Sequence, residues 1–478
     1  MNTPIYDFVR KYKEAHISRL HMPGHKGQAF LGCEDMDITE IKGADVLSMA
    51  DGIIKESQEN AASLFGAGAT FYSTEGSSQC IKAMLETVRH DYVNRTSKKK
   101  NSCGNDLCGY DKEKEVCRPR IIAARNVHRA MIDACALIDI DIDFLMPGSS
   151  SSICSGMIKG KMLDKKLSSY TTMPMGVYIT SPDYLGNIAD IKEISSVCDK
   201  YDIPLIVDNA HGAYLAFMED NIHPMNLGAA ICCDSAHKTL PVLTGGAYVH
   251  ISERYKERYT GYMSKALTLF GSTSPSYLIM QSLDICNAYL AGDYRDKLLK
   301  TVKKVDKTKK MLRNKSVPVI DSEKLKIVID AAASGYTGEM IAEEMRNYGI
   351  ECEYADRQFI VLMFSTENSD TDFERVVNWA DKSVLTNNAK KKIVYKDIYP
   401  EKIKKSMTIR EAVFSPSEMI DVSEALGRVC AAETISCPPA VPIAVSGEVI
   451  DRQMIDLFTS YGIEKVCVVA GVTVQTQA

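Results

Sequence analysis

The chain has 478 residues, of which 57 are Lys or Arg and 62 are Asp or Glu, so its formal net charge is −5. Hydrophobic residues make up 45% and charged residues 25%, the usual mixture of a globular protein, which excludes a disordered chain or a coiled coil. The small negative charge also disfavours nucleic acid as a partner, because phosphate binding requires clustered Lys and Arg. The length allows two to four domains, or one large α/β body with additional parts.

The first sixty residues contain short amphipathic pieces, which residues 21–27 (HMPGHKG) interrupt as a structured loop rich in Pro and Gly. The N-terminal sequence is charged throughout and lacks the apolar centre of a signal peptide. No run approaches the ~20 apolar residues that a membrane helix needs. We therefore expect a soluble, cytoplasmic protein with no membrane partner, whose 15 cysteines are mostly reduced thiols.

From about residue 64 to residue 234, short apolar runs alternate with segments of helical spacing. Residues 176–180 and 203–208 are two such runs, and residues 188–202 between them carry apolar side chains at helical spacing. This strand–helix–strand pattern, with runs that are apolar on both faces, is typical of a parallel sheet buried on both sides. The predicted fold class is therefore α/β with a mainly parallel sheet.

A polar, Lys-rich segment at about 94–120 interrupts this pattern and contains Cys103, Cys108 and Cys117. A zinc site would need a fourth ligand, and the segment contains no histidine to supply it. We therefore predict a surface loop and no metal site.

After about residue 317 the chain predicts a smaller α/β layer. Its strands are expected at 324–329 and 359–364, with a helix near 337–348, and a Pro-rich stretch follows near 437–442. The sequence thus predicts four parts: an N-terminal arm (1–63), a large domain (64–316), a small α/β domain (317–387) and a C-terminal segment (388–478).

Three predicted strands end in residues that carry chemistry, at 125–128 (RNVH), 208–212 (DNAHG) and 234–239 (DSAHKT). The carboxyl ends of parallel strands meet in one crevice, where ligands bind. An acid, histidines and a lysine at one edge suit pyridoxal phosphate, which forms a Schiff base with lysine and needs a carboxylate at its pyridine nitrogen. Residues 71–78 (FYSTEGSS), just before a predicted helix, offer a seat for the phosphate.

Each of these residues also has an ordinary explanation. A lysine after a strand is usually exposed to solvent, and an aspartate there often forms a turn or caps a helix. His128 and His211 can be structural histidines with hydrogen-bond partners, and a Gly-Ser-Ser turn is common. Their shared position at predicted strand ends favours the cofactor site.

The strings at 21–27, 37–40 (DITE) and 235–241 (SAHKTLP) together resemble the ornithine/lysine/arginine decarboxylase family of fold-type I pyridoxal-phosphate enzymes. The resemblance continues through further strings and covers nearly the whole chain: 180–186, 207–213, 271–277, 424–428 and 438–442. It implies a large cofactor domain with a smaller C-terminal α/β domain, in the short form of the family that has no receiver-like domain first.

The resemblance also implies a role for each residue of the site. Lys238 would form the Schiff base, Asp208 would bind the pyridine nitrogen and His128 would stack on the ring. Lys238 or His237 would return a proton to Cα. Ser272 and Thr273 would reach the phosphate of a neighbouring subunit, which implies a homodimer at least. The other cofactor-binding residues would be Gly76, Ser77, Ser78, Thr180, Ala210, His211, Ser235 and His237.

Several residues depart from the family pattern and leave the substrate open. Glu75 replaces a usual Asn, while Asn209 and Tyr214 replace a usual Glu and His. Further changes occur at Gly245-Gly246, Cys437, Ala440 and Ser446. The expected reaction is decarboxylation of a basic L-amino acid, with arginine favoured over lysine or ornithine. Transamination or elimination on the same cofactor is one alternative, and a catalytically silent regulatory relative is another.

Overall fold

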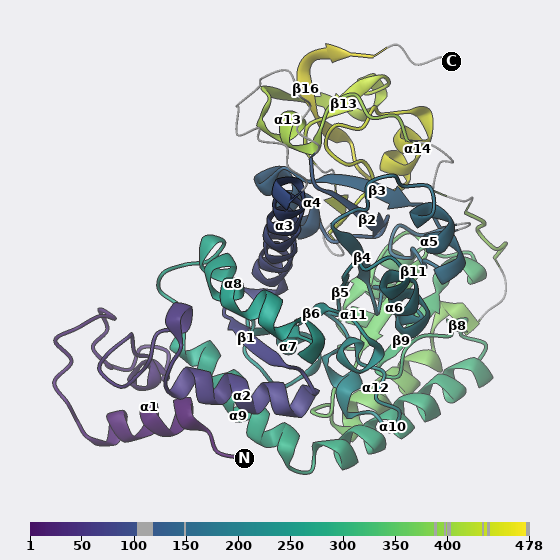
Figure 1. Ribbon diagram of the computed structural model, residues 1–478. Coiled ribbons are helices and arrows are strands. Elements are labelled where there is room, and N and C mark those ends of the chain that lie inside the picture. Colours follow the sequence, from purple (N-terminus) through teal and green to yellow (C-terminus); the bar gives the residue numbers. More distant parts are fainter. Residues whose placement is uncertain are drawn as a thin grey trace. The chain divides into compact units, whose positions relative to one another are not determined.

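The computed structural model describes residues 1–102, 118–147, 150–386, 390–395, 398, 403–432, 435–436 and 440–474 (Figure 1). Cys103, Cys108, Cys117 and Cys437 lie outside these residues. The chain forms two units, each assembled from separate segments: Met1–Ile121, Asp164–Ile179 and Asp190–Arg295 in the first, and Ile122–Leu163, Thr180–Ala189 and Asp296–Ala478 in the second. The four-part division expected from the sequence stays a prediction.

A seven-stranded sheet has the strand order β1-β7-β6-β5-β4-β2-β3. Its strands are β1 (Ala69–Ser73), β2 (Arg120–Ala124), β3 (Asp141–Leu145), β4 (Gly176–Thr180), β5 (Leu205–Asp208), β6 (Ile231–Asp234) and β7 (Ala247–Ile251). β5 and β6 pair in parallel, whereas β7 runs antiparallel to β6 and to β1. Every residue of β5 and β6 is buried, as in strands that are covered on both faces. The predicted α/β fold class is confirmed.

Helix α6 (Ile191–Lys200) forms the predicted strand–helix–strand unit between β4 and β5. It begins after Asp190, whose carboxylate accepts a hydrogen bond from the N–H of Glu193 at 2.9 Å. The first unit also contains α1 (Pro4–Glu14), α2 (Ile53–Phe65), α3 (Gly76–Ser102), α7 (Ala236–Thr239), α8 (Lys256–Leu269) and α9 (Tyr277–Ala291). Helices α1, α2 and α9 pack against one another, and α3 packs along α8 (Figure 1).

Helix α3 is longer than the sequence pattern indicated. It begins at Gly76, directly after β1, and it continues to Ser102. Residues 94–102, expected to open a surface loop, are therefore helical, and residues 103–117 lie outside the described part of the chain.

The second unit contains the smaller sheets. One has the order β10-β11-β9-β8, with β8 (Val319–Ile320), β9 (Lys326–Asp330), β10 (Tyr354–Ala355) and β11 (Phe359–Met363). The others are β12-β16-β13, with β12 (Ser417–Asp421), β13 (Arg428–Cys430) and β16 (Lys465–Thr473), and the pair β14 (Ile435–Ser436) and β15 (Val441–Pro442). Its helices include α4 (Arg129–Ile138), α10 (Tyr294–Asn314, which begins in the first unit), α11 (Gly338–Arg346), α12 (Asp370–Ala380), α13 (Ile409–Phe414) and α14 (Arg452–Ser460), while α5 (Gly160–Leu167) crosses the unit boundary.

The predicted strand–helix–strand layer after residue 317 is present as β9, α11 and β11. Ile327 and Ile329 of β9 pair with Leu362 and Ile360 of β11 and are buried with Trp379 of α12. This alternation of core-facing residues produces the apolar pattern that the sequence showed. None of the helices in the described residues has both the length and the apolar composition needed to cross a bilayer.

Candidate active site

The ends of β5 and β6 bring two loops of the first unit together. The parallel register sets Asp208, the last residue of β5, opposite Cys233, and Asp234 ends β6 one residue later. The N–H of Asn209 donates to the carbonyl of Cys233 at 3.0 Å, so a hydrogen bond joins the two strands just beyond their last paired residues. Two of the three strand ends predicted from the sequence therefore lie side by side.

Asp208 is buried, with 2% of its surface exposed. Its carboxylate accepts hydrogen bonds from the Tyr178 hydroxyl and from the Ala210 N–H, each at 3.2 Å, and from the Cys233 thiol at 3.8 Å. Within the described residues it has no Lys, Arg or His as an ion-pair partner. The neutral donors support a carboxylate at this position, and a cationic ring nitrogen would be a further favourable partner for it.

Lys238 and His211 meet across the two loops. Lys238 lies in the single turn of α7, and its Nζ is 3.1 Å from Nε2 of the buried His211. Next to it, His237 Nδ1 lies 3.1 Å from the Gly246 carbonyl, a contact that requires the proton on Nδ1. In a neutral His237 ring, Nε2 is then the basic nitrogen.

The residues predicted to bind the phosphate lie at the N-terminus of α3, and their contact with it stays a prediction. Gly76 adopts a left-handed φ of +73°, which glycine tolerates, and its N–H donates to the Gly245 carbonyl at 2.7 Å. Ser77 and Ser78 follow in the first helical turn, whose N–H groups attract anions. A Cβ at position 76 would meet no atom within 4 Å, so the approach to this turn is open.

Two hydroxyl groups of the β6 loop are unsatisfied. Ser235 Oγ and Thr239 Oγ1 are buried and have no hydrogen-bond partner among the described residues. Such groups cost free energy unless a ligand or water pairs with them. Together with Asp208, which has neutral donors and no cationic partner among the described residues, and with the N-terminus of α3, they fit a ring that carries a phosphate and a protonated nitrogen.

His128 and Thr180 belong to the second unit, and each is described by its own surroundings. His128 precedes α4 and accepts the N–H of Ala130 at its Nδ1 at 3.1 Å, so it caps that helix. Thr180 ends β4, and its buried Oγ1 has no hydrogen-bond partner in the described part of the chain. The stacking role of His128 and the cofactor contact of Thr180 stay predictions.

Ala210, Ser272 and Thr273 complete the predicted set. Ala210 is buried beside Asp208, whereas Ser272 and Thr273 lie in an exposed loop. The N–H of Ser272 donates to the Glu75 carboxylate. Glu75, one of the departures from the family pattern, therefore connects this loop to the start of α3. The contact of Ser272 and Thr273 with a neighbouring subunit stays a prediction.

Sequence reasoning gave no role to Tyr178 or to Asp234, although Asp234 begins the predicted strand end at 234–239. A tyrosine in an otherwise apolar buried strand was the available sign for Tyr178, because a buried hydroxyl needs a partner. Asp234 accepts hydrogen bonds from Asn209 and His223, and no local pattern indicated a link to His223.

Sequence comparison identifies the family. The major-domain profile of the Orn/Lys/Arg decarboxylases matches residues 3–95 and 114–333, and their C-terminal-domain profile matches residues 388–462. The chain belongs to the Orn/Lys/Arg decarboxylase family. The predicted family and the predicted class of enzyme, an amino-acid decarboxylase, are thereby confirmed.

Relatives within the Orn/Lys/Arg decarboxylase family match over almost their whole length. The arginine decarboxylase of Bacillus subtilis (strain 168) is 28% identical, over 95% of this chain and 92% of the relative. The arginine decarboxylase of Bacillus anthracis is 24% identical, with the same two coverages.

Several solved structures share the fold. The constitutive lysine decarboxylase of Escherichia coli superimposes with a TM-score of 0.74 at 17% identity, over 98% of this chain and 80% of that one. The Francisella novicida lysine decarboxylase LdcF gives a TM-score of 0.73 at 16% identity, over 97% and 79%. A serine palmitoyltransferase of Sphingomonas wittichii superimposes with a TM-score of 0.52 at 15% identity, over 80% of this chain and 83% of that one.

Proposed function

We propose that this chain is a pyridoxal-phosphate-dependent decarboxylase of a basic L-amino acid, with arginine as the favoured substrate. The observation that carries the proposal is Asp208, a buried carboxylate without a cationic partner in the described residues, beside the loop that holds Lys238. Arginine is favoured over lysine because several relatives that match over nearly their whole length are arginine decarboxylases. Likeness to the lysine decarboxylases is at the level of the fold.

Each residue of the proposed site has a role toward one part of the cofactor. Pyridoxal phosphate, when bound, supplies a sink for the electron pair that remains at Cα after carbon dioxide leaves. Asp208 would hold the proton of the ring nitrogen, with the Tyr178 hydroxyl and the Ala210 N–H orienting its carboxylate. Ser77, Ser78 and Ser235 would donate to the phosphate, and the resemblance implies a contact with the ring for Ala210 and for His128.

Proton transfer falls to Lys238 and His237. Lys238 Nζ would be the group that binds the cofactor, and His211 Nε2, at 3.1 Å, would orient this amine. Lys238 Nζ, or Nε2 of His237, then delivers a proton to Cα before the amine product leaves. Replacing His237 by Asn is expected to slow this step more than it weakens cofactor binding.

The chain is also proposed to act as a cytoplasmic homodimer. Its first fifty residues expose large apolar side chains: Leu20 is 95%, Leu31 90% and Phe30 80% exposed. Single exposed apolar residues are ordinary, but several in one segment are typical of a contact surface. The described cysteines form no disulfide with one another, as in a reducing compartment.

The test is a product assay on the purified protein with added pyridoxal phosphate. Arginine, lysine and ornithine are supplied separately, and released carbon dioxide and amine are measured. We expect equal amounts of both products, with the highest kcat/KM for arginine. Borohydride should fix a pyridoxyl group on the peptide that contains Lys238, and Lys238→Ala should abolish it.

Other outcomes would overturn parts of the proposal. A keto acid without carbon dioxide would establish transamination, and ammonia with a keto acid would establish elimination. A colourless protein without the pyridoxyl peptide would establish a catalytically silent relative. A higher kcat/KM for lysine or ornithine would overturn only the proposal that arginine is the favoured substrate.

A further inference from the structure

Asp234 has a buried carboxylate that none of the catalytic steps above uses. It ends β6, four residues before Lys238, and it is fully buried. Its Oδ1 accepts a hydrogen bond from Asn209 Nδ2 at 2.6 Å. Asn209, also fully buried, separates Asp208 from Ala210 at the end of the neighbouring strand. The carboxylate therefore connects the loop of the proposed ring partner to the loop of the proposed lysine.

Two histidines lie against the other carboxylate oxygen, His223 with a hydrogen bond and His250 in contact without one. His223 Nε2 lies 2.9 Å from Asp234 Oδ2, and His250 Nε2 lies 3.3 Å from the same oxygen. Burial alone would raise the pKa of Asp234, but the two imidazoles hold it well below its usual value. Asp234 therefore remains an anion inside the fold. Unlike Asp208, it already has histidines as partners.

The protonation pattern of the cluster favours a hydrogen-bonded network over a metal site. The Met225 N–H donates to His223 Nδ1 at 3.3 Å, so the proton of a neutral ring lies on Nε2 and points at Asp234. A metal would need that same Nε2 as a bare lone pair. His250 Nδ1 is engaged with the Thr70 hydroxyl at 2.8 Å.

An aromatic ring packs against both histidines of the cluster. The Phe65 ring stacks on His250 with a centroid separation of 4.4 Å and an interplanar angle of 30°, and it also contacts His223 at 5.4 Å. All three rings are buried. The packed rings fix the direction of the His223 donor, and this donor fixes the carboxylate that Asn209 meets.

We propose that Asp234 is a positioning residue for this reaction: through Asn209 it fixes Asp208 and His211 relative to Lys238. The inference rests on the proposed function. Asn209 donates where a carboxylate would repel Asp234 at the same distance, so the identity of both residues matters. Exchanging them, as Asn209→Asp with Asp234→Asn, restores an amide–carboxylate pair in the opposite direction.

The experiment compares three variants with the holoenzyme: Asp234→Asn, Asn209→Asp and the double exchange. The readouts are the pyridoxal phosphate dissociation constant after removal and return of the cofactor, the pH midpoint of its visible band, and kcat and KM. The midpoint reports the surroundings of Lys238, where His211 Nε2 lies 3.1 Å from Nζ and where Asp208 and Asp234 end the neighbouring strands β5 and β6. Asp284→Asn is the matched control, since Asp284 is fully buried in the same unit but bonds to Ser57 and to Ile5 and Tyr6 of α1.

We expect each single variant to weaken cofactor binding by about tenfold and to move the band midpoint by about half a pH unit or more, with kcat falling more than KM rises. The exchange should recover about half of the loss on a logarithmic scale, and Asp284→Asn should leave all three readouts unchanged. Single variants that lower only thermal stability, with the band and affinity of the parent protein, would overturn the proposal. Stoichiometric zinc or another metal in the purified protein, lost in Asp234→Asn, would replace it with a metal site. If the parent protein binds no cofactor, the proposed function itself fails.

Discussion

At the scale of single residues, Asp208 and Asp234 show how surroundings divide tasks between identical side chains. Both end buried parallel strands and both are almost without exposed surface. Asp234 already has Asn209 and two histidines, whereas Asp208 has neutral donors and no cation within the described residues. Sequence position alone assigned Asp208 correctly to the β5 end, but only the contacts show which carboxylate still needs a positive charge.

Replacing Asp208 by Asn is expected to lower kcat by about a thousandfold, because an amide cannot keep the proton on the ring nitrogen and the electron sink weakens. Tyr178→Phe removes one hydrogen bond that orients the Asp208 carboxylate, and it should lower kcat by about tenfold. Steady-state kinetics with arginine would measure both. Equal losses in the two variants would contradict the role given to Asp208.

Ala440 adopts a left-handed backbone, with φ at +57°, which costs a residue that has a Cβ about 1 kcal/mol. Ala440→Gly removes this strain, so we expect the free energy of unfolding of the second unit to rise by up to about 1 kcal/mol. Urea unfolding would measure the change. Ala15→Gly, at an exposed right-handed position, should lower stability instead. A loss of stability in Ala440→Gly would contradict the interpretation.

At the scale of elements, helix ends and strand ends place most of the proposed site. The start of α3 presents N–H groups, the ends of β5 and β6 present the loops, and the turn of α7 presents Lys238. These positions were predictable, because apolar runs, Gly76 and the polar residues after each run all have local causes. The full length of α3 was not predictable, because its last turns are polar and carry no apolar stripe.

Asp284 of α9 fastens α1 to the rest of the first unit. Its Oδ2 accepts the N–H groups of Ile5 and Tyr6 at 2.9 and 3.0 Å. Burial raises the pKa of Asp284 from 3.8 to about 6, although these hydrogen bonds oppose the rise. The folded state therefore binds a proton more tightly than the unfolded state, so this contribution is favourable below about pH 4 and is lost as the pH rises to about 6.

Asp284→Asn should remove that dependence while keeping an oxygen for α1 and an N–H for Ser57. We expect the difference in unfolding free energy between variant and parent to shift in favour of the variant by up to about 3 kcal/mol between pH 4 and pH 7. Urea unfolding at several pH values would measure it. A difference that is constant over this range would show that Asp284 does not titrate there.

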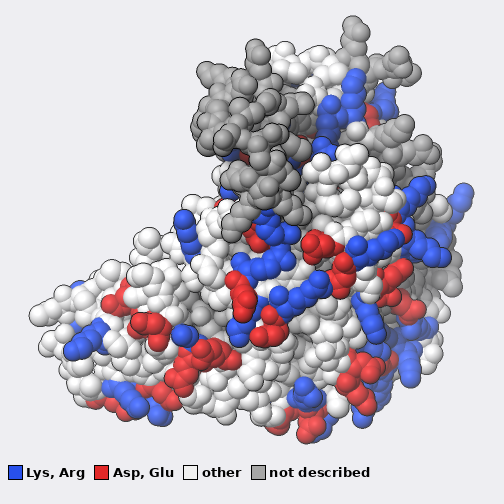
Figure 2. Space-filling view, in the orientation of Figure 1, with Lys and Arg blue, Asp and Glu red and all other residues white. Residues whose placement is uncertain are grey.

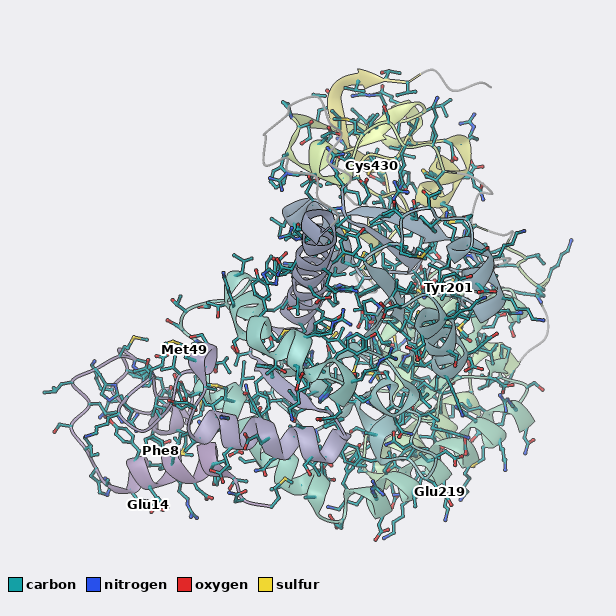
Figure 3. All side chains as sticks on the ribbon, in the orientation of Figure 1. Phe8, Glu14, Met49, Tyr201, Glu219 and Cys430 are labelled. Carbon is teal, nitrogen blue, oxygen red and sulfur yellow. The ribbon has the colours of Figure 1, made fainter. Side chains whose placement is uncertain are left out.

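At the scale of the whole molecule, the N-terminal segment leaves apolar surface uncovered. Figure 2 shows white areas between the charged side chains of this segment, the purple part of Figure 1. Met49, labelled in Figure 3, is 74% exposed, and Leu20, Phe30 and Leu31 are more so. A second copy of the chain is the partner that the resemblance implies.

Phe30→Asp combined with Leu31→Asp should convert the proposed dimer to a monomer, because two buried charges at a contact cost more than a protein interface of ordinary size recovers. Sedimentation velocity would show the change in mass. Activity should fall by about tenfold or more if Ser272 and Thr273 serve the neighbouring subunit. Arg10→Asp, on the exposed side of α1, is the control and should leave the dimer intact. A dimer that persists in the double variant would place the interface elsewhere.

By itself the sequence determined the family, the α/β fold class, the predicted strands at 176–180 and 203–208 and the candidates Lys238 and Asp208. These follow from short-range patterns of polarity and from strings of neighbouring residues. Only the tertiary structure decided that Asp234 joins Asn209, His223 and His250, and that Ser235 retains an unsatisfied hydroxyl. These contacts join residues far apart in the chain, and their geometry depends on strand register and side-chain packing, which no local pattern encodes.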